Sequence, residues 1–353
     1  MAVLDRNSVT STCLHHIDIG ANSSTEFPAD LNNRELEVYL ETLLREIGEK
    51  EQKRSFLFPL QDTDFKKVAL AIAKSSDLQK EAVGSFLAER LLAVEVKTSQ
   101  KYSHLSKKDD THVKIGSFLQ FTYSEKGCLR YLGVKVEHQV ILDQVDFKKK
   151  AGLGLTDKIY KAVSVEYSPD GTPVDVYIYD SKSKLTRYWW ADFLEVQEKN
   201  TDTFNTQKAS QEIISKLATL KKNFPQDHTV LRNATVAAFK QKGTMDYSVF
   251  LDKTIRNYES DNPEFKKAKE ALIKKLEVLP AKKGFDTLFV LVPEAVPFRK
   301  TTYKLNNDMF LTIKDGTENL EQKVWAEITK DGRELLVIET SEARNFKRKE
   351  RVA

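Results

Sequence analysis

The stretch that decides the fold runs from Ser117 to His138 and reads SFLQFTYSEKGCLRYLGVKVEH. It holds two segments rich in β-branched and aromatic residues, Ser117–Tyr123 and Cys128–His138, and such residues favour strands. The polar segment Ser124–Gly127 between them ends in glycine, which is typical of a turn. The stretch therefore predicts two paired strands.

The predicted sheet continues downstream. Lys161–Tyr167 has the same β-rich composition, and Ser168–Gly171 (Ser-Pro-Asp-Gly) is a strong turn signal. After that turn the apolar residues Val174, Val176 and Ile178 alternate with polar ones, as in a half-buried strand. Together these segments predict an antiparallel sheet of about four strands.

Helical spacing dominates the sequence before this sheet. A short apolar segment, Leu14–Ile19, is expected to be an opening strand, and apolar residues three or four positions apart follow it. Asp62 or Thr63 could cap the second of the helices that this spacing predicts. The helices are expected at Asn32–Glu51, Thr63–Lys74 and Asp77–Leu92.

Helices and then strands return after Trp190. Asp227, Asp246 and Asn262 with Pro263 are plausible helix starts, and Asp331 with Gly332 is a hairpin turn signal. The helices are expected at Thr206–Lys222, Asp227–Lys242, Met245–Asn257 and Pro263–Leu279. The strands are expected at Leu288–Val292, Phe310–Lys314, Val324–Thr329 and Glu334–Glu339. Successive blocks of one element type, without strict alternation, indicate the α+β class with two lobes.

A polar segment between Glu198 and Phe204 lacks apolar periodicity and is the best candidate for a domain boundary. It predicts an N-terminal domain of residues 1–198, with helices and an antiparallel sheet. It also predicts a C-terminal domain of residues 204–353, with helices, a small sheet and a basic tail.

Composition places the chain in a broad class. Its 353 residues suffice for about two domains. No segment approaches the ~20 apolar residues that cross a bilayer, and the N-terminus does not resemble a signal peptide. Cys13 and Cys128 lie far apart, which is typical of free thiols in a reducing compartment. We therefore expect a cytoplasmic protein without membrane contact.

Catalytic motifs are missing from the sequence. It has no phosphate-binding loop, no HExxH and no nucleophile elbow. His15, His16 and Asp18 are a possible metal set, but adjacent strand residues point to opposite faces, so the two histidines would not converge. The sequence accordingly predicts no catalytic residue, no metal and no cofactor.

A metal-dependent nuclease stays open as an alternative. Carboxylates on and after neighbouring strands could hold magnesium, as they do in nucleases. No Asp-x(n)-Glu-x-Lys pattern with the right spacing accompanies them. The candidates are Glu137, Asp143, Asp146, Glu166, Asp175 and Asp180.

Basic residues beside aromatic ones are the more informative signal, because cations neutralise a phosphate backbone and release its counterions. Two of the three tryptophans, Trp189 and Trp190, directly follow one such cluster. On a strand one would face inward and the other outward; we take Trp190 as the candidate for contact. The candidate DNA-binding residues are Lys148, Lys149, Lys150, Lys182, Lys184, Arg187, Trp190, Arg344, Lys347, Arg348 and Lys349.

Three blocks of this sequence resemble a known family. Gly127–Val134, Leu185–Tyr188, and Val324 and Trp325 with Asp331–Ile338 are similar to segments of the bacterial nucleoid-associated protein family typified by YejK, also called NdpA. The chain departs from that family at Trp189–Asp192, where the family usually has Phe-x-Lys-Gly. The resemblance implies a DNA-binding protein of the nucleoid that associates with topoisomerase.

Taken together, these features predict a homodimer that binds double-stranded DNA largely without base readout, since no helix-turn-helix or zinc finger is recognisable. Two alternatives stay open: a metal-dependent nuclease, for example in phage defence, and a protein-binding adaptor.

Overall fold

The computed structural model of the chain describes residues 9–27, 38, 42, 54–102, 116–137, 139–142, 149–152, 159–180 and 185–347, with backbone alone at 102, 137, 139–142, 149–152 and 159–160. The chain forms two compact units. The first is Met1–Thr201 with Asp286–Phe289, and the second is Asp202–Phe285 with Val290–Ala353. The division at Thr201 lies within the polar segment Glu198–Phe204. The α+β class is confirmed.

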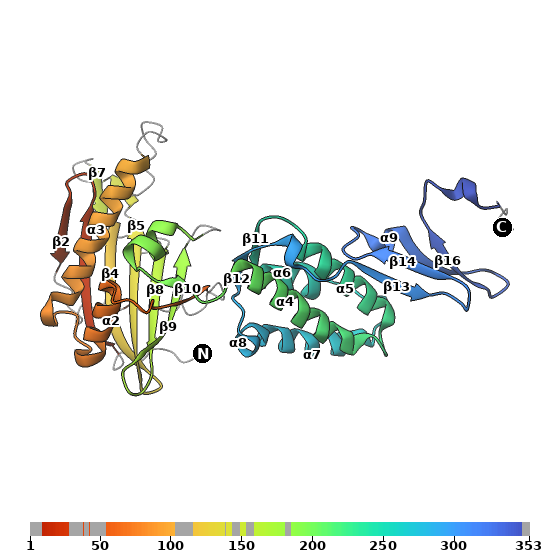
Figure 1. Cartoon of the computed structure of the whole chain (residues 1–353), viewed down its shortest axis with the longest axis horizontal. Coiled ribbons are helices and arrows are strands. Elements are labelled where there is room, and N and C mark those ends of the chain that lie inside the picture. Colours follow the sequence, from red (N-terminus) through yellow and green to blue (C-terminus); the bar gives the residue numbers. More distant parts are fainter. Residues whose placement is uncertain are drawn as a thin grey trace. The chain divides into compact units, whose positions relative to one another are not determined.

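An eight-stranded antiparallel sheet is the centre of the first unit, in the order β10-β3-β9-β8-β5-β4-β1-β2 (Figure 1). Our expectation of about four strands was too low, because the strands β2, β3 and β10, at or next to the edges of the sheet, are short and lack apolar alternation. The strands are β1 (Val9–Asp18), β2 (Ser23–Phe27), β3 (Arg54–Leu57), β4 (Gly116–Glu125), β5 (Cys128–Glu137), β8 (Ile159–Tyr167), β9 (Pro173–Asp180) and β10 (Gln197–Glu198). A separate two-stranded ribbon joins β6 (Gln139–Leu142) to β7 (Lys149–Gly152).

The predicted hairpin is confirmed as β4 and β5, which pair from Gly116 opposite Glu137 to Glu125 opposite Cys128. The two residues of its turn, Lys126 and Gly127, both have positive φ, at 54° and 79°. A two-residue turn with both φ values positive matches the right-handed twist of the strands it joins.

Helices α2 (Asp64–Ser75) and α3 (Val83–Tyr102) lie across the sheet (Figure 1). The N-cap of α2 is Thr63, whose hydroxyl accepts the Lys66 amide proton at 3.3 Å. The apolar residues on the inward face of this helix are buried: Phe65, Val68, Ala69 and Ile72. The helix expected at Asp77–Leu92 instead begins at Val83 and ends at Tyr102, because a short turn, η2 (Lys80–Ala82), precedes it. The helix expected at Asn32–Glu51 falls almost entirely outside the described residues.

Two lysine–carboxylate pairs are buried in this unit. Lys135 and Lys161 stand opposite each other in the β5–β8 register, and neither is exposed to solvent. Lys135 pairs with Glu95 of α3, and Lys161 donates to Asp180 at 2.6 Å. Each cation therefore has an anion beside it, which buried charges require.

The second unit begins with a helical layer. Asp246 caps α6 as predicted, accepting the amide protons of Ser248 and Val249. Asp227 does not start a helix: α5 begins at Pro225, and Asp227 is buried, where it accepts the Tyr258 hydroxyl at 2.9 Å. The elements are α4 (Asp202–Leu217), η5 (Ala218–Leu220), α5 (Pro225–Phe239), β11 (Thr244–Asp246), α6 (Tyr247–Leu251), η6 (Asp252–Arg256), α7 (Phe265–Glu277), α8 (Leu279–Lys283) and η7 (Pro293–Ala295). The short strand β12 (Leu288–Val290) lies mostly in Asp286–Phe289, which belongs to the first unit.

Two antiparallel ribbons follow this helical layer (Figure 1). The first pairs β13 (Lys300–Lys304) with β14 (Phe310–Lys314), and the second pairs β15 (Val324–Ile328) with β16 (Glu334–Ile338). The short helix α9 (Leu320–Lys323) connects them, and η8 (Ala343–Asn345) follows the second. Strand β13 was not predicted. The Asp331–Gly332 turn is confirmed, with Gly332 at φ 79°.

Candidate nucleic-acid interface

One face of the β13–β14 ribbon is basic and exposed. Alternation along each strand puts Lys300, Thr302 and Lys304 of β13 on the same face as Phe310, Thr312 and Lys314 of β14. All six side chains are exposed, whereas the residues between them are half-buried. The hydroxyls of Thr302 and Thr312 lie 3.0 Å apart across the ribbon, which agrees with both side chains projecting from the same face. No acidic residue lies on this face of the two strands.

Lys300 and Lys314 stand directly opposite each other in this face. Like charges in that position destabilise a ribbon. Within the described part of the chain, neither lysine nor Lys304 has a carboxylate within ion-pair distance. The arrangement lowers ribbon stability and leaves three ammonium groups free to bind an external anion.

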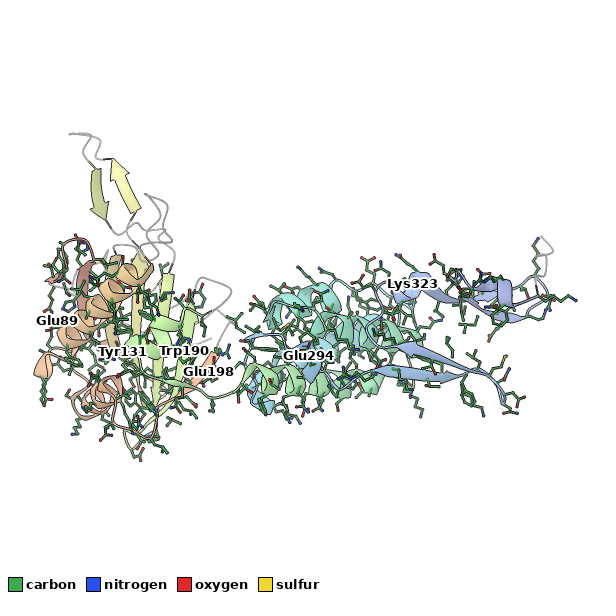
Figure 2. The ribbon with its side chains drawn as sticks, turned by 45° about the horizontal axis from the view of Figure 1, so that its top comes forward. Glu89, Tyr131, Trp190, Glu198, Glu294 and Lys323 are labelled. Carbon is green, nitrogen blue, oxygen red and sulfur yellow. The ribbon has the colours of Figure 1, made fainter. Side chains whose placement is uncertain are left out.

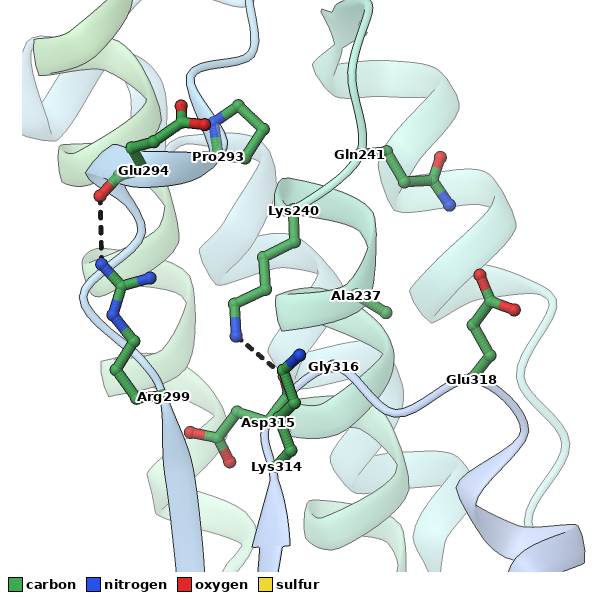
Figure 3. Close-up of a pocket in the computed structure, with 10 residues that line it drawn as sticks. All are labelled: Ala237, Lys240, Gln241, Pro293, Glu294, Arg299, Lys314, Asp315, Gly316 and Glu318. Atoms are coloured by element: carbon green, nitrogen blue, oxygen red, sulfur yellow. Dashed lines mark hydrogen bonds between the residues drawn. The ribbon is translucent and has the colours of Figure 1, made fainter.

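A pocket of about 580 Å³ lies at the base of this ribbon (Figure 3). Three of the side chains lining it are cations, Lys240, Arg299 and Lys314, and three are carboxylates, Glu294, Asp315 and Glu318. Lys240 donates to the backbone carbonyl of Asp315 at 2.8 Å, and Arg299 donates to the carbonyl of Glu294 at 3.3 Å (Figure 3). The pocket is therefore lined by charges of both signs.

Crowding of positive charge affects Lys240. Partial burial lowers the pKa of Lys240, and the neighbouring Arg299, Lys314 and Arg232 lower it further, although Asp315 acts in the opposite direction. The pocket and the basic ribbon face share Lys314, so the pocket adjoins that face.

Asp315 fixes the base of the ribbon to helix α5. Its carboxylate accepts two hydrogen bonds from Arg232, at 2.7 and 2.9 Å, and a third from the Thr301 hydroxyl at 2.5 Å. Burial alone would raise the pKa of Asp315, but these hydrogen bonds and the cations Arg232 and Lys240 hold it below its usual range. Gly316 follows with φ 82°, and a Cβ there would lie 3.2 Å from the Ala237 backbone. These contacts therefore hold the base of the ribbon firmly against helix α5.

The DNA-binding residues predicted from the sequence lie elsewhere. Lys149 and Lys150 lie in β7, where the backbone alone is described. Arg187 is exposed, just before the turn η4 (Tyr188–Phe193). Arg344 and Lys347 are exposed, and Arg344 lies 3.4 Å from Glu342. The other predicted lysines and arginines fall outside the described residues: Lys148, Lys182, Lys184, Arg348 and Lys349.

Contrary to our expectation, the tryptophan pair does not lie on a strand. Trp189 and Trp190 lie in the helical turn η4, where both contribute to the core of the first unit. Trp189 is 1% exposed and its ring lies 4.9 Å from that of Phe193. Trp190 is half-buried, with its ring 5.6 Å from that of Phe56 (Figure 2). Packing of these rings accounts for both residues without nucleic acid.

The carboxylates considered for a nuclease are largely engaged. Glu166 lies 3.6 Å from Arg130, Asp175 is 2.5 Å from Lys199, and Asp180 pairs with Lys161. Asp143 and Asp146 fall outside the described residues, and the side chain of Glu137 is not described. Among the side chains that the structure places, the one group of metal-ligand type comes from other residues, Cys13, His15 and Glu26.

Sequence reasoning missed the basic ribbon because β13 was not recognised. In the segment Lys300–Lys304 (Lys-Thr-Thr-Tyr-Lys), Lys300, Thr302 and Lys304 occupy every second position, as on one face of a strand. That spacing was the available signal. Within the described ranges no helix is long and apolar enough to span a bilayer. No model of a known protein family and no curated protein matches this chain, so the family resemblance stays a prediction.

Proposed function

We propose that the chain binds duplex DNA largely independently of sequence, with the basic face of the β13–β14 ribbon as the principal contact. The observation that carries this proposal is the set of three exposed, unpaired lysines on one face, Lys300, Lys304 and Lys314. A two-stranded ribbon is narrow enough to enter the major groove of B-DNA, about 12 Å wide.

The chemistry of this face favours phosphate over base recognition. Lysine ammonium groups act as point charges and suit phosphate oxygens, which position a protein without reading sequence. The face offers no asparagine, glutamine or arginine, the residues that make bidentate contacts with bases. Thr302 and Thr312 could donate to phosphate or base, but their hydroxyls already share a hydrogen bond. Sequence preference is therefore expected to be weak.

The test compares two triple variants in a salt titration of DNA binding by the full chain. Lys300, Lys304 and Lys314 are changed to Ala in one, and three exposed lysines on other surfaces, Lys126, Lys253 and Lys330, in the control. Both changes remove the same net charge. The ribbon variant should bind more weakly and lose about three units of the slope of log affinity against log salt, about 0.9 for each phosphate contact.

An equal loss in both variants would show that only total charge matters and would overturn the assignment to the ribbon. Affinity that does not change with salt would overturn DNA binding itself, as would a strong preference for one short site. The same reactions with magnesium and supercoiled plasmid distinguish binding from cleavage, so that nuclease activity would appear as nicked or linear DNA.

We further propose that two copies associate through the β15–β16 ribbon. The register puts Ala326 beside Leu336 and Ile328 beside Glu334 on one face, while Ile328 is 75% exposed and Leu336 is 42% exposed. A two-stranded ribbon alone is marginally stable in water, and exposed apolar patches mark contact sites. A second copy offers the same apolar face, as an isologous dimer requires.

Changing Ile328 and Leu336 together to Asp should convert a dimer to a monomer in light scattering. The control is Val174→Asp, an exposed apolar strand residue of the first unit, 47% exposed. A wild-type chain that is monomeric at high concentration would contradict the proposal.

A further inference from the structure

A mixed cluster of sulfur, nitrogen and oxygen ligands lies at the β1–β2 edge of the sheet. Cys13 and His15 are two positions apart in β1, so both project from the same face. Glu26 of β2 stands directly opposite His15 in the register, which brings its carboxylate to that face as well. The three ligand atoms all lie within 4.8 Å of one another.

Two distances from the Cys13 sulfur match those between the ligand atoms of a tetrahedral zinc site, while Nε2 of His15 lies 3.9 Å from Oε2 of Glu26. Zinc binds sulfur at about 2.3 Å and nitrogen or oxygen at about 2.0 Å, so tetrahedral ligand atoms lie about 3.3–3.6 Å apart. The Cys13 sulfur lies 3.4 Å from Nδ1 of His15 and 3.6 Å from Oε1 of Glu26. Little movement of the side chains would be needed to admit an ion between them.

Neighbouring residues orient these ligands. Nε2 of His15 lies 3.3 Å from the Ser85 hydroxyl, so a hydrogen bond there fixes the ring with Nδ1 toward the sulfur. The Gln79 amide donates to Oε1 of Glu26 at 2.8 Å. Metal-binding histidines and carboxylates are typically held by such outer partners.

The start of helix α3 lies directly over the Cys13 sulfur. A Cβ at Gly84 would come within 2.6 Å of that sulfur, so a residue without a side chain is needed at this position. The N-terminal end of a 20-residue helix carries partial positive charge, which favours a thiolate and a carboxylate beside it. Cys13 is 1% exposed, while the Glu26 side chain is 39% exposed and gives an ion a path inward.

We infer that Cys13, His15 and Glu26 form a binding site for zinc or a similar late transition metal, with water as fourth ligand. Cysteine, histidine and carboxylate together are the donor set that zinc prefers. Binding is a proton exchange: the Cys13 S–H bond breaks, the sulfur–metal bond forms, and the thiol proton goes to solvent.

The test is a cobalt titration of the full chain, followed by displacement with zinc. We expect one cobalt ion per chain, a thiolate-to-cobalt charge-transfer band in the near ultraviolet, and release of about one proton. Cys13→Ser should abolish the band, and Glu26→Gln should keep it while weakening cobalt binding at least about tenfold.

The chain provides matched controls in Cys128→Ser and His16→Gln, which change the other cysteine and the adjacent histidine. Both should retain the band. Loss of the band in Cys128→Ser, or its persistence in Cys13→Ser, would overturn the assignment. Absence of cobalt uptake by the wild type would show that the cluster is only a hydrogen-bonded network. If Cys13→Ser fails to fold, Glu26→Gln decides, because Glu26 is exposed.

This inference is independent of the proposed DNA binding. The ribbon variant with Ala at 300, 304 and 314 should bind cobalt like the wild type.

Discussion

The molecule contains two pairs of lysines that stand opposite each other on neighbouring strands, and their surroundings differ completely. In the first unit, Lys135 and Lys161 are buried between β5 and β8, and each has its own carboxylate. In the second, Lys300 and Lys314 are exposed between β13 and β14, and neither has a carboxylate partner in the described structure. The same cross-strand arrangement is therefore neutralised inside the fold of one unit and left as exposed positive charge in the described part of the other.

The difference teaches where function is to be sought in a protein without recognisable motifs. Charges that the fold has already neutralised contribute to the fold itself, and their removal is expected to damage stability. Charges that the fold leaves unpaired at a cost in stability are candidates for binding. Each prediction that follows tests one side of this contrast.

The largest effect is expected from Lys161→Met. The change leaves the Asp180 carboxylate buried without its cation, and should lower the free energy of unfolding by about 3–5 kcal/mol. Lys199→Met is the matched control, because its pair with Asp175 lies nearer solvent and should contribute at most about 1 kcal/mol. Urea unfolding measures both. Equal losses of stability in the two variants would show that burial of the ion pair does not determine its contribution to the free energy of unfolding.

The two tryptophans of η4 should also differ. Trp189→Ala opens a cavity beside Phe118 and Phe193 and should cost about 3–5 kcal/mol of stability. Trp190→Ala should cost less, because that side chain is already half exposed. Neither change should alter DNA affinity under conditions where the variant is folded. A selective loss of DNA binding in Trp190→Ala would contradict this prediction and show that Trp190 belongs to the DNA-binding interface.

Asp315→Asn tests how the ribbon is anchored. Replacing the carboxylate weakens charge-assisted bonds with Arg232 and should cost about 1.5–3 kcal/mol at neutral pH. Because the folded-state pKa of Asp315 is depressed, its contribution is present above the unfolded value of about 3.9 and is lost as pH falls through the lower folded value. The variant should therefore lose this part of the acid dependence. Trp325 fluorescence follows unfolding of the second unit.

The smallest and most discriminating effect is expected from Lys300→Glu. A glutamate opposite Lys314 replaces a like-charge pair by an opposite-charge pair and should stabilise the ribbon by about 0.2–1 kcal/mol. DNA affinity should fall at the same time. Lys330→Glu, a charge reversal elsewhere on the surface, is the control. If Lys300→Glu leaves affinity unchanged, or destabilises the unit, the ribbon face is not the contact.

Much of the fold could be predicted because local patterns and tertiary packing agree. The β4–β5 hairpin combines β-rich segments with a turn that needs positive φ. The N-cap of α2, Thr63, is of a residue type that is recognised as a helix start in the sequence. Strands as short as β2 and β3 could not be predicted, since five or four residues without alternation carry too little signal. The pairing of β3 also depends on β9, a partner distant in the sequence.

The candidate sites were harder to predict for the same reason. We considered His15 with the adjacent His16 as metal ligands and overlooked Cys13. Cys13 and His15 lie two positions apart on a strand and therefore project from the same face. Glu26 joins them only through the β1–β2 register, which sequence spacing does not determine. At the ribbon, Lys314 meets Lys300 only after the chain has turned back on itself.

The return of Asp286–Phe289 to the first unit has a consequence for synthesis. The buried Asp286 carboxylate accepts the amide proton of Ser55 in β3 at 3.0 Å, although the rest of the unit ends at Thr201. At about 5–20 residues per second, a ribosome delivers Asp286 several seconds after Thr201. The nascent first unit must wait for this partner while most of the second unit's helical layer emerges. A recombinant fragment that stops at Thr201 would lack the hydrogen bond permanently, so expression of the first unit alone is expected to yield an incompletely closed sheet edge.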